Sequence, residues 1–301
     1  MPIQASIIAD SFNPVGNRLT TFVLEFPRII LSELNTHRSL SKNSASSRAI
    51  PFEKMLERAK TDPFIPTKFQ KDHSGMQGTE YYEANEDKLC IQDWLNARDK
   101  AVDAALDFRF PVTKQLRNRL LEPFMWHKVI LSATEFENFF ALRAHKDAEI
   151  HIAELAYKML EAYNASEPKY LNEGDWHIPF GDKINEDRLF NKYLNDAATY
   201  PQLHMISVDD AKKKIAIARC ARVSYNNFEG KDDYEADIKL CDRLFGGNPK
   251  HLSPTEHVAQ AQNNSDWSGN YRGFKQYRKM FDNENLSDPR VIQKFKPNVT
   301  S

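Results

Sequence analysis

The sequence predicts an α+β fold in which strands near the N-terminus pack against a layer of helices. Residues 3–9 and 19–26 are rich in β-branched and aromatic side chains, and Pro27 closes the second run. From residue 91 to about residue 163 the apolar residues recur with helical spacing. The 301 residues are enough for one large α/β domain or two average ones.

The remaining elements follow in order. After Pro27, apolar residues up to Leu34 form one face of a helix, which fades into the polar residues that begin at Asn35. A short helix is expected over 52–60, followed by a long irregular stretch. Further helices are expected over 91–109, 111–121, about 125–163, 184–197, 208–222, 232–245 and 271–282.

Charge and hydropathy exclude several classes of protein. Lys and Arg total 41 against 42 for Asp and Glu, a formal charge of −1, so no general basic field favours nucleic acid and any phosphate site must be local. There is no run of about 18 apolar residues that predicts a membrane span. The first residues, MPIQASIIADSFNP, do not resemble a secretory signal, so a cytoplasmic location is expected.

The chain also lacks several familiar motifs. It contains no GxGxxG, no GxxxxGK[ST] and no HExxH. The three cysteines, Cys90, Cys220 and Cys241, are far apart, which predicts reduced thiols rather than disulfides or a zinc knuckle. None of them lies in a Pro-Cys-His context.

A polar cluster at 36–48, THRSLSKNSASSR, indicates a binding site for a phosphorylated ligand. Hydroxyl and backbone N–H groups donate to phosphate oxygens, and Arg38 and Arg48 suit bidentate contacts. The alternative is a solvated serine-rich turn whose cations point outward.

Two further segments are unusual. In EFENFFALRAHKDAEIHIAEL, Asn138 and Arg143 lie among apolar residues, and a buried arginine needs a partner or a ligand; an ion pair with Asp147 is the alternative. In HLSPTEHVAQ, two histidines flank Ser253 and Glu256, whose spacing also suits a capping box at a helix start.

These segments together resemble the flavin-dependent thymidylate synthases (ThyX). The family signature RHRxxSxNExSxR is matched by Thr36-His37-Arg38, Ser41, Asn43, Ser46 and Arg48 at the same spacing. Three other segments resemble family motifs: RLLEP at 119–123 is similar to RxxxP, ARVSY at 221–225 to ARVSF, and HLSPTEH at 251–257 to HxTPFEH. The matched segments span much of the chain.

The order of the segments differs from the family, because ARVSY and HLSPTEH follow the signature here instead of preceding it. We interpret this order as a circular permutation in a divergent, viral-like (phage-like) member. The resemblance then implies an antiparallel sheet flanked by a layer of helices in one ThyX-like domain over residues 1–301. A loop insertion is expected at about 61–90 and a connecting segment at about 165–210.

The resemblance also implies roles. Arg143 would be the catalytic arginine, polarising the pyrimidine of dUMP for C5 methylation to dTMP. FAD would be the cofactor, with NADPH and methylenetetrahydrofolate as co-substrates, in a homotetramer with active sites between subunits. The implied substrate-binding residues are Glu33, Ser44, Ser46, Ser47, Arg48 and Arg119. The implied cofactor-binding residues are Thr36, His37, Arg38, Ser132, Asn138, His251, Ser253 and Glu256. No metal ligand is implied.

Several residues depart from the family pattern. Thr36 replaces an arginine, Ser44 a glutamate and Glu33 a glutamine, and Ser132-Ala-Thr stands for Asn-x-Arg. A carboxylate accepts from an exocyclic amino group, so Glu33 raises the alternative of a cytosine nucleotide. Methylation of dCMP and hydroxymethylation of the pyrimidine therefore remain alternative reactions.

Two unrelated functions also remain open. YRGFKQYRKMF at 271–281 interleaves cations with aromatic residues, as a single-strand nucleic-acid binding module does, although at helical spacing the aromatics would pack inward. His145 with Glu149, and Asp147 with His151, have the i,i+4 spacing of metal ligands, but surface charge pairing is the usual outcome.

Overall fold

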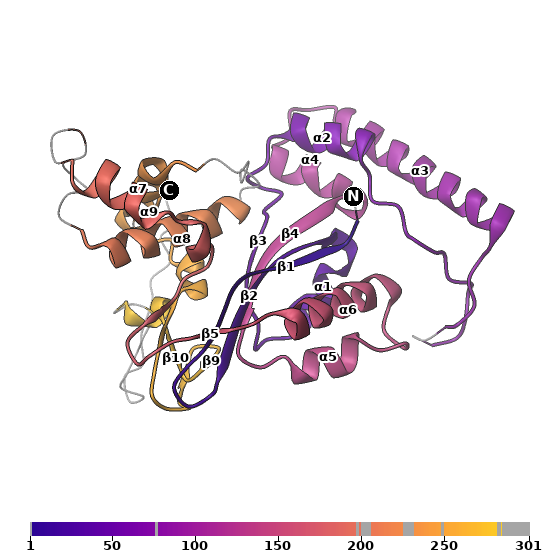
Figure 1. Cartoon of the computed structure of the whole chain (residues 1–301). Helices are drawn as coiled ribbons and strands as arrows, with labels where there is room; N and C mark the ends of the chain where they lie inside the picture. Colours follow the sequence, from indigo (N-terminus) through magenta and orange to yellow (C-terminus); the bar gives the residue numbers. More distant parts are fainter. Residues whose placement is uncertain are drawn as a thin grey trace, which may run out of the picture.

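A five-stranded sheet forms the centre of the chain (Figure 1). The computed structural model describes residues 2–75, 78–196, 199, 206–224, 232–247, 250–281 and 284. The strand order is β3-β4-β2-β1-β5, antiparallel except for the parallel pair β1 and β5. The strands are β1 (Gln4–Phe12), β2 (Arg18–Pro27), β3 (Ser41–Ser44), β4 (Trp126–Ala133) and β5 (Lys169–Tyr170).

One face of this sheet is covered by three helices, α1 (Leu31–Thr36), α5 (Glu137–Arg143) and α6 (Ile150–Ala165). Alternate residues of β2, Phe22, Leu24 and Phe26, point to this face because side chains alternate along a strand. They pack with residues of β4 and of α6 into the largest apolar core of the described chain. Burial of such side chains stabilises a fold by about 1.5–3 kcal/mol each.

The opposite face carries the C-terminal part of the chain. Helix α8 (Val208–Ser224) contacts β3 and β4, and α9 (Tyr234–Gly246) packs against α8. Val23 and Ile130 of the sheet meet Cys220 and Val223 of α8. The smaller elements here are α7 (Glu186–Leu189), the π-helix η4 (Phe190–Leu194), and the 3-10 helices η3 (Gly181–Lys183), η5 (Ser253–His257) and η6 (Tyr277–Met280).

Short strands join this part to the main sheet. A three-stranded sheet has the order β10-β7-β6, and β8 pairs with β9. These strands are β6 (Trp176–His177), β7 (Ala259–Ala261), β8 (Trp267–Ser268), β9 (Tyr271–Arg272) and β10 (Phe274–Gln276).

A third group of helices lies at the β3 edge of the sheet. Helices α2 (Phe52–Thr61), α3 (Ala84–Leu106) and α4 (Lys114–Leu121) share a separate core that includes Met55, Val102 and Leu121. Only Val102 and Ala105 of α3 are fully buried, and Figure 1 shows this helix extending away from the sheet. Two 3-10 helices, η1 (Arg28–Ile30) and η2 (Glu122–Phe124), pack together between these layers.

The α+β class is confirmed, but two predicted helices are wrong. Residues 126–133, expected to be helical, form β4, which pairs with β2 on one side and β3 on the other. Helix α8 packs on one face of β4, and the core shared with α6 covers the other. A strand buried on both faces reads as a continuous apolar run, which periodicity does not distinguish from a helix. Residues 271–276 form β9 and β10, because Gly273 adopts φ +73° between them.

The other expected helices are present with shifted ends. The predicted insertion at about 61–90 holds an irregular stretch, with one isolated bridge between Gln70 and Tyr81, and then the first turns of α3, which begins at Ala84. The expected connecting segment contains β5, β6, η3, α7 and η4 in its described part. Among the described residues, no helix combines the length and the apolar character needed to cross a membrane.

Candidate functional site

The predicted polar cluster spans three kinds of local structure. Thr36 ends α1, the next residues turn, and Ser41–Ser44 pairs with the centre of β4 as the edge strand β3. Beyond β3 the chain turns again, with the N–H of Ala45 donating to the carbonyl of Lys128 over 3.0 Å. The cluster therefore follows the rim of the sheet.

Arg143 and His37, 106 residues apart in the sequence, meet at this rim. The Nε–H of Arg143 donates to Nε2 of His37 over 3.0 Å, and an Nη of Arg143 lies 3.5 Å from the hydroxyl of Thr36. The His37 ring packs edge-on against Phe139, with ring centroids 5.0 Å apart. The alternative ion pair of Arg143 with Asp147 does not form, since Asp147 lies 3.7 Å from His145 instead.

This contact fixes the protonation state of His37. A guanidinium only donates, so Nε2 of His37 must accept, and the ring proton is on Nδ1. Burial lowers the pKa of His37, and the positive charges of Arg143 and Lys42 lower it further. His37 is therefore a neutral acceptor that orients a partly exposed guanidinium at neutral pH.

Lys42 is a functional residue that the sequence reading missed. Its amino group donates to the carbonyls of His37 over 2.6 Å and Leu34 over 3.2 Å, which closes the C-terminal end of α1. Burial lowers the pKa of Lys42 to about 8. The sequence signal for this role was the position of Lys42 a few residues after the end of the predicted helix, because lysine side chains near a helix C-terminus bind its free carbonyls.

The predicted phosphate contacts lie on the turn after β3 and on α4. Asn118, fully buried in α4, donates to the carbonyls of Ser47 over 2.7 Å and Ile50 over 3.0 Å. Ser47 is buried and Ser44 and Ser46 are half-buried, whereas Arg48 and Arg119 are exposed. Helix α4 therefore holds the turn in place, and Arg48 of the turn and Arg119 of α4 are both exposed.

One predicted cofactor contact, Thr36, lies beside Arg143. Thr36 at the end of α1, Arg38 just beyond it and Asn138 in the first turn of α5 are all exposed. They offer a hydroxyl, a guanidinium and an amide, groups that suit the phosphates and ring carbonyls of a flavin nucleotide. Glu33 is half-buried on α1 and accepts from the Ser32 hydroxyl over 2.9 Å.

The predicted cofactor contacts of the C-terminal part are more scattered. His251 and Ser253 are exposed, and η5 lacks the expected side-chain cap at its start. The carboxylate of Glu256 is bound to Arg278, which also binds Glu284 over 2.9 Å. Glu256 is therefore committed to a contact within the chain.

Ser132 belongs to a buried hydrogen-bonded chain that the sequence did not reveal. Ser11 lies 3.0 Å from Nδ1 of His177, whose Nε2 lies 2.8 Å from the hydroxyl of Thr21. Thr21 lies 2.7 Å from Ser132, which lies 2.8 Å from Nδ1 of His257. Ser132 is 0% exposed, so in this chain it connects β2 to η5 and does not reach the surface.

His177 and His257, the two histidines of this hydrogen-bonded network, are neutral. Burial is the main cause that lowers the pKa of His177 to about 4 and that of His257 to about 3. The sequence placed His257 in a turn crowded with polar residues and predicted no role for His177. Neither residue's partner is near it in sequence, so no local pattern predicted the pair.

Two of the three cysteines are unsuited to nucleophilic catalysis. Cys220 and Cys241 are buried, and burial raises the pKa of both thiols, that of Cys241 to about 12. Cys90 is half-buried on α3. A nucleophilic cysteine needs a stabilised thiolate, and the buried pair have the opposite environment.

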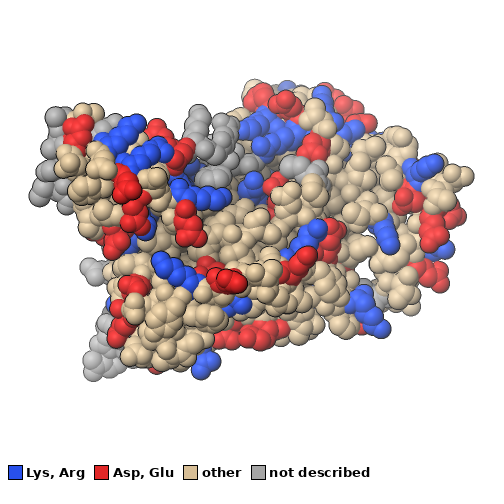
Figure 2. Space-filling model, viewed as in Figure 1, with Lys and Arg blue, Asp and Glu red and all other residues tan. Residues whose placement is uncertain are grey.

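The two unrelated alternatives find little support. Tyr271 and Phe274 are buried, so these rings of the 271–281 segment are closed to a nucleic-acid base. Figure 2 shows acidic and basic side chains interspersed over this face of the molecule. Among the described residues no group of three His, Cys, Asp or Glu side chains is arranged for a metal, and Glu149 instead caps α6.

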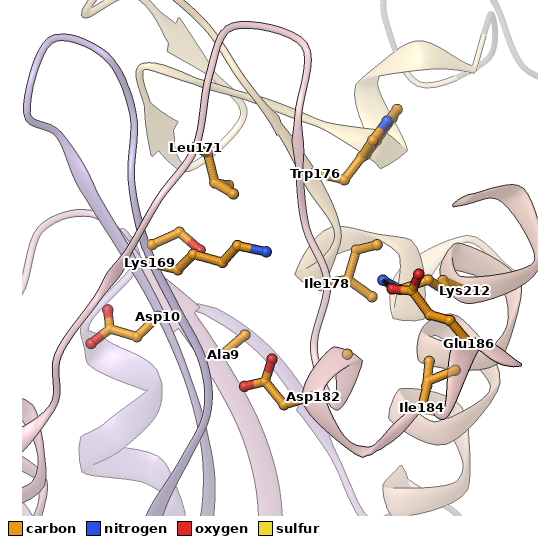
Figure 3. Close-up of a pocket in the computed structure, with 12 residues that line it drawn as sticks. Ala9, Asp10, Lys169, Leu171, Trp176, Ile178, Asp182, Ile184, Glu186 and Lys212 are labelled. Atoms are coloured by element: carbon orange, nitrogen blue, oxygen red, sulfur yellow. Dashed lines mark hydrogen bonds and ion pairs between the residues drawn. The ribbon is translucent and has the colours of Figure 1, made fainter. Parts of the chain in front are cut away.

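A separate cavity of about 230 Å³ lies between the β1–β5 edge and α8 (Figure 3). Figure 3 shows the amino group of Lys169 directed into the space above Asp10 and Asp182. Asp10 already binds Arg18 at 2.6 Å, and Glu186 binds Lys212 at 2.5 Å. None of the predicted site residues lines this cavity.

No protein-family model matches the chain, and no curated protein matches it. Solved structures that resemble it include the UMP/dUMP methylase PolB from Streptomyces cacaoi bound with 5-Br UMP, at 14% identity and a TM-score of 0.44 over 54% of this chain and 88% of that one. ThyX from Helicobacter pylori with FAD and dUMP is also similar, at 17% identity and a TM-score of 0.31 over 48% of this chain and 67% of that one. The residues that indicate a function are therefore those of this chain, above all Arg143 and His37.

Proposed function

We propose that this chain is a flavin-dependent enzyme that methylates C5 of a pyrimidine deoxynucleotide, converting dUMP to dTMP. The observation that carries the proposal is the contact of Arg143 with neutral His37, the histidine of the ThyX-like signature. The fold brings these residues together from distant elements, and a structural ion pair with Asp147 does not account for Arg143.

Arg143 has a defined chemical task in this reaction. Methylation at C5 needs electron density at that carbon, which leaves negative charge on N3 and O2 of the ring. A fixed guanidinium beside those atoms stabilises that charge. His37 holds the guanidinium by accepting from Nε, and Lys42 holds His37 through its backbone carbonyl, so the charge is oriented before the nucleotide arrives.

The donors at the ends of α1 and α5 fit a flavin nucleotide. Thr36, Arg38 and Asn138 would hold FAD, with His251 and Ser253 contributing where a second copy meets this face in a homotetramer. Ser132 and Glu256 are engaged within the chain and fit this role less well. When bound, the flavin supplies the redox chemistry, with NADPH as reductant and methylenetetrahydrofolate as the one-carbon donor.

The nucleotide itself would lie across the rim between Arg143 and the turn after β3. Ser46, Ser47, Arg48 and Arg119 would bind its phosphate, the group that hydroxyls and guanidinium forks suit. Glu33 and Ser44 would contact the rest of the nucleotide.

We also propose the permuted order of segments for this chain. Residues 221–224 of the ARVSY-like segment end α8, whereas Tyr225 lies outside the described residues. The HLSPTEH-like segment includes η5, and both α8 and η5 contact β3 and β4. Segments that come late in the sequence therefore adjoin the signature strand. A permutation preserves such contacts while it changes the connections.

The test combines a visible spectrum with product analysis. Purified protein, with and without added FAD, is expected to bind flavin and to convert dUMP into a product heavier by one methylene, with turnover dependent on methylenetetrahydrofolate and NADPH. A product carrying a hydroxymethyl group, or turnover of dCMP only, would favour the alternative reactions and the reading of Glu33 as an acceptor for an amino group. Protein that binds no FAD and transforms neither nucleotide would contradict the proposal.

A further inference from the structure

A small cavity lies directly behind the turn after β3. It is lined by Arg28, Ala45, Ser47, Ile50, Met55, Arg58, Met125, Trp126 and His127. Two arginines and Ser47 are among these residues, and no acidic residue is. None of Arg28, Arg58 and His127 was among the residues predicted from the sequence.

His127, one of the residues that line the cavity, has a buried donor without an acceptor. An Nη of Arg28 lies 3.0 Å from Nδ1 of His127, and because a guanidinium only donates, Nδ1 must accept. The ring proton is therefore on Nε2. That atom is buried and has no hydrogen-bond partner among the described residues, and His127 as a whole is only 3% exposed.

The neutral state of His127 is consistent with its surroundings. Burial lowers the pKa of His127 to about 3, and the charge of Arg28 lowers it further. Arg28 is itself held 3.0 Å from Glu122. The indole N–H of Trp126, the residue before His127, is a second buried donor without an acceptor, and Trp126 is also one of the residues that line the cavity.

The unpaired N–H groups of His127 and Trp126 favour a hydrogen-bond acceptor nearby. Leaving a buried donor unpaired costs about 1–3 kcal/mol, so the cavity favours an occupant that brings lone pairs. Its volume of about 20 Å³ admits roughly one oxygen-sized group. Guanidinium groups favour an anionic oxygen over a neutral one.

We propose that His127, with Arg28 and Arg58, binds one oxygen of a phosphate monoester whose remaining oxygens contact the turn at Ser46, Ser47 and Arg48. This inference rests on the proposed binding of a nucleotide and deepens it, because it adds a buried donor set to the exposed arginines. A site that encloses one oxygen of a terminal phosphate selects a monophosphate over a nucleoside.

The test follows the His127 ring directly. Long-range ¹H–¹⁵N correlation spectra of the wild-type protein report the tautomer and hydrogen bonding of each histidine. Inorganic phosphate and dUMP are each expected to shift His127 Nε2 saturably, and deoxyuridine is not. His177 and His257, which belong to the other buried network, serve as internal controls and are expected to remain unchanged.

A variant provides a second measurement. His127→Phe retains a ring against Phe26, whose centroid lies 5.7 Å away, and removes the donor. We expect phosphate affinity to fall about tenfold or more, as for loss of one hydrogen bond to a charged group. The wild-type spectra decide the question if this variant does not fold.

The outcomes separate this inference from the proposed function. A shift with phosphate but not with dUMP would support the oxyanion site and contradict nucleotide binding. An Nε2 resonance of His127 that does not shift with phosphate or with dUMP would overturn the inference, whether or not these ligands bind elsewhere. The cavity would then hold only water.

Discussion

Replacing Arg143 with alanine is expected to reduce kcat for dUMP methylation by about 10²- to 10³-fold, or roughly 3–4 kcal/mol, the effect of removing one preorganised donor from a developing oxyanion. The charge that Arg143 stabilises develops on the ring during reaction, so the dissociation constant for dUMP is expected to change much less. Flavin binding, followed by the visible spectrum, is expected to persist. Steady-state kinetics and nucleotide titration together check this split.

Two further variants make this result specific. Arg143→Lys retains the charge but loses the Nε–H that His37 accepts, so it is expected to recover only part of the turnover. Arg109→Ala, an exposed arginine outside the proposed site, is expected to leave turnover unchanged. Turnover of Arg143→Ala within a few-fold of wild type would show that another group polarises the pyrimidine.

Mild acid is expected to destabilise the fold steeply. The pKa values of His127 and His257 are lowered to about 3 and that of His177 to about 4, so the folded state favours their neutral forms. This contribution is fully present above the unfolded-state pKa of about 6.5 and is lost as the pH falls toward the folded-state values. At about pH 4.5 each histidine would cost roughly 2–3 kcal/mol, together comparable to the whole stability of a typical domain.

Urea unfolding across this pH range measures the effect. The free energy of unfolding is expected to fall with a slope of at least three protons, to which His37 adds because its pKa is also lowered in the folded state. His177→Gln is expected to reduce the slope by about one proton. His145→Gln, at a residue whose side chain is half exposed, is the matched control for the loss of a histidine outside the buried groups. Equal slopes for wild type and His177→Gln would mean that His177 is not held neutral by the fold.

Local patterns predicted the elements whose surroundings are simple. Strands β1 and β2 lie close to their expected ranges, and α2, α8 and α9 have ends within a few residues of the predicted ones. The family resemblance implied roles for Arg143 and His37 in one active site but not a contact between them, and the structure shows the hydrogen bond that joins them. These features depend on residues near in sequence or on a shared motif.

The features that were missed depend on tertiary packing. Strand β4 has no alternation because both of its faces are buried, and the donor set of Arg28 and His127 becomes visible only when β2 and β4 pair at Phe26 and His127. The resemblance implied that Ser132 contacts the cofactor, yet Ser132 is buried and links two histidines from distant segments through Thr21. Such arrangements follow from strand register, which the sequence alone does not specify.

Intact-protein mass spectrometry after incubation with 5-fluoro-dUMP and methylenetetrahydrofolate tests the central claim most directly. Fluorine at C5 traps the adduct of any enzyme that activates the pyrimidine by adding a thiolate at C6. Because activation is assigned to Arg143 and two of the three thiols are buried, we predict that the protein mass is unchanged. A covalent adduct mapped to Cys90, Cys220 or Cys241 would contradict the account.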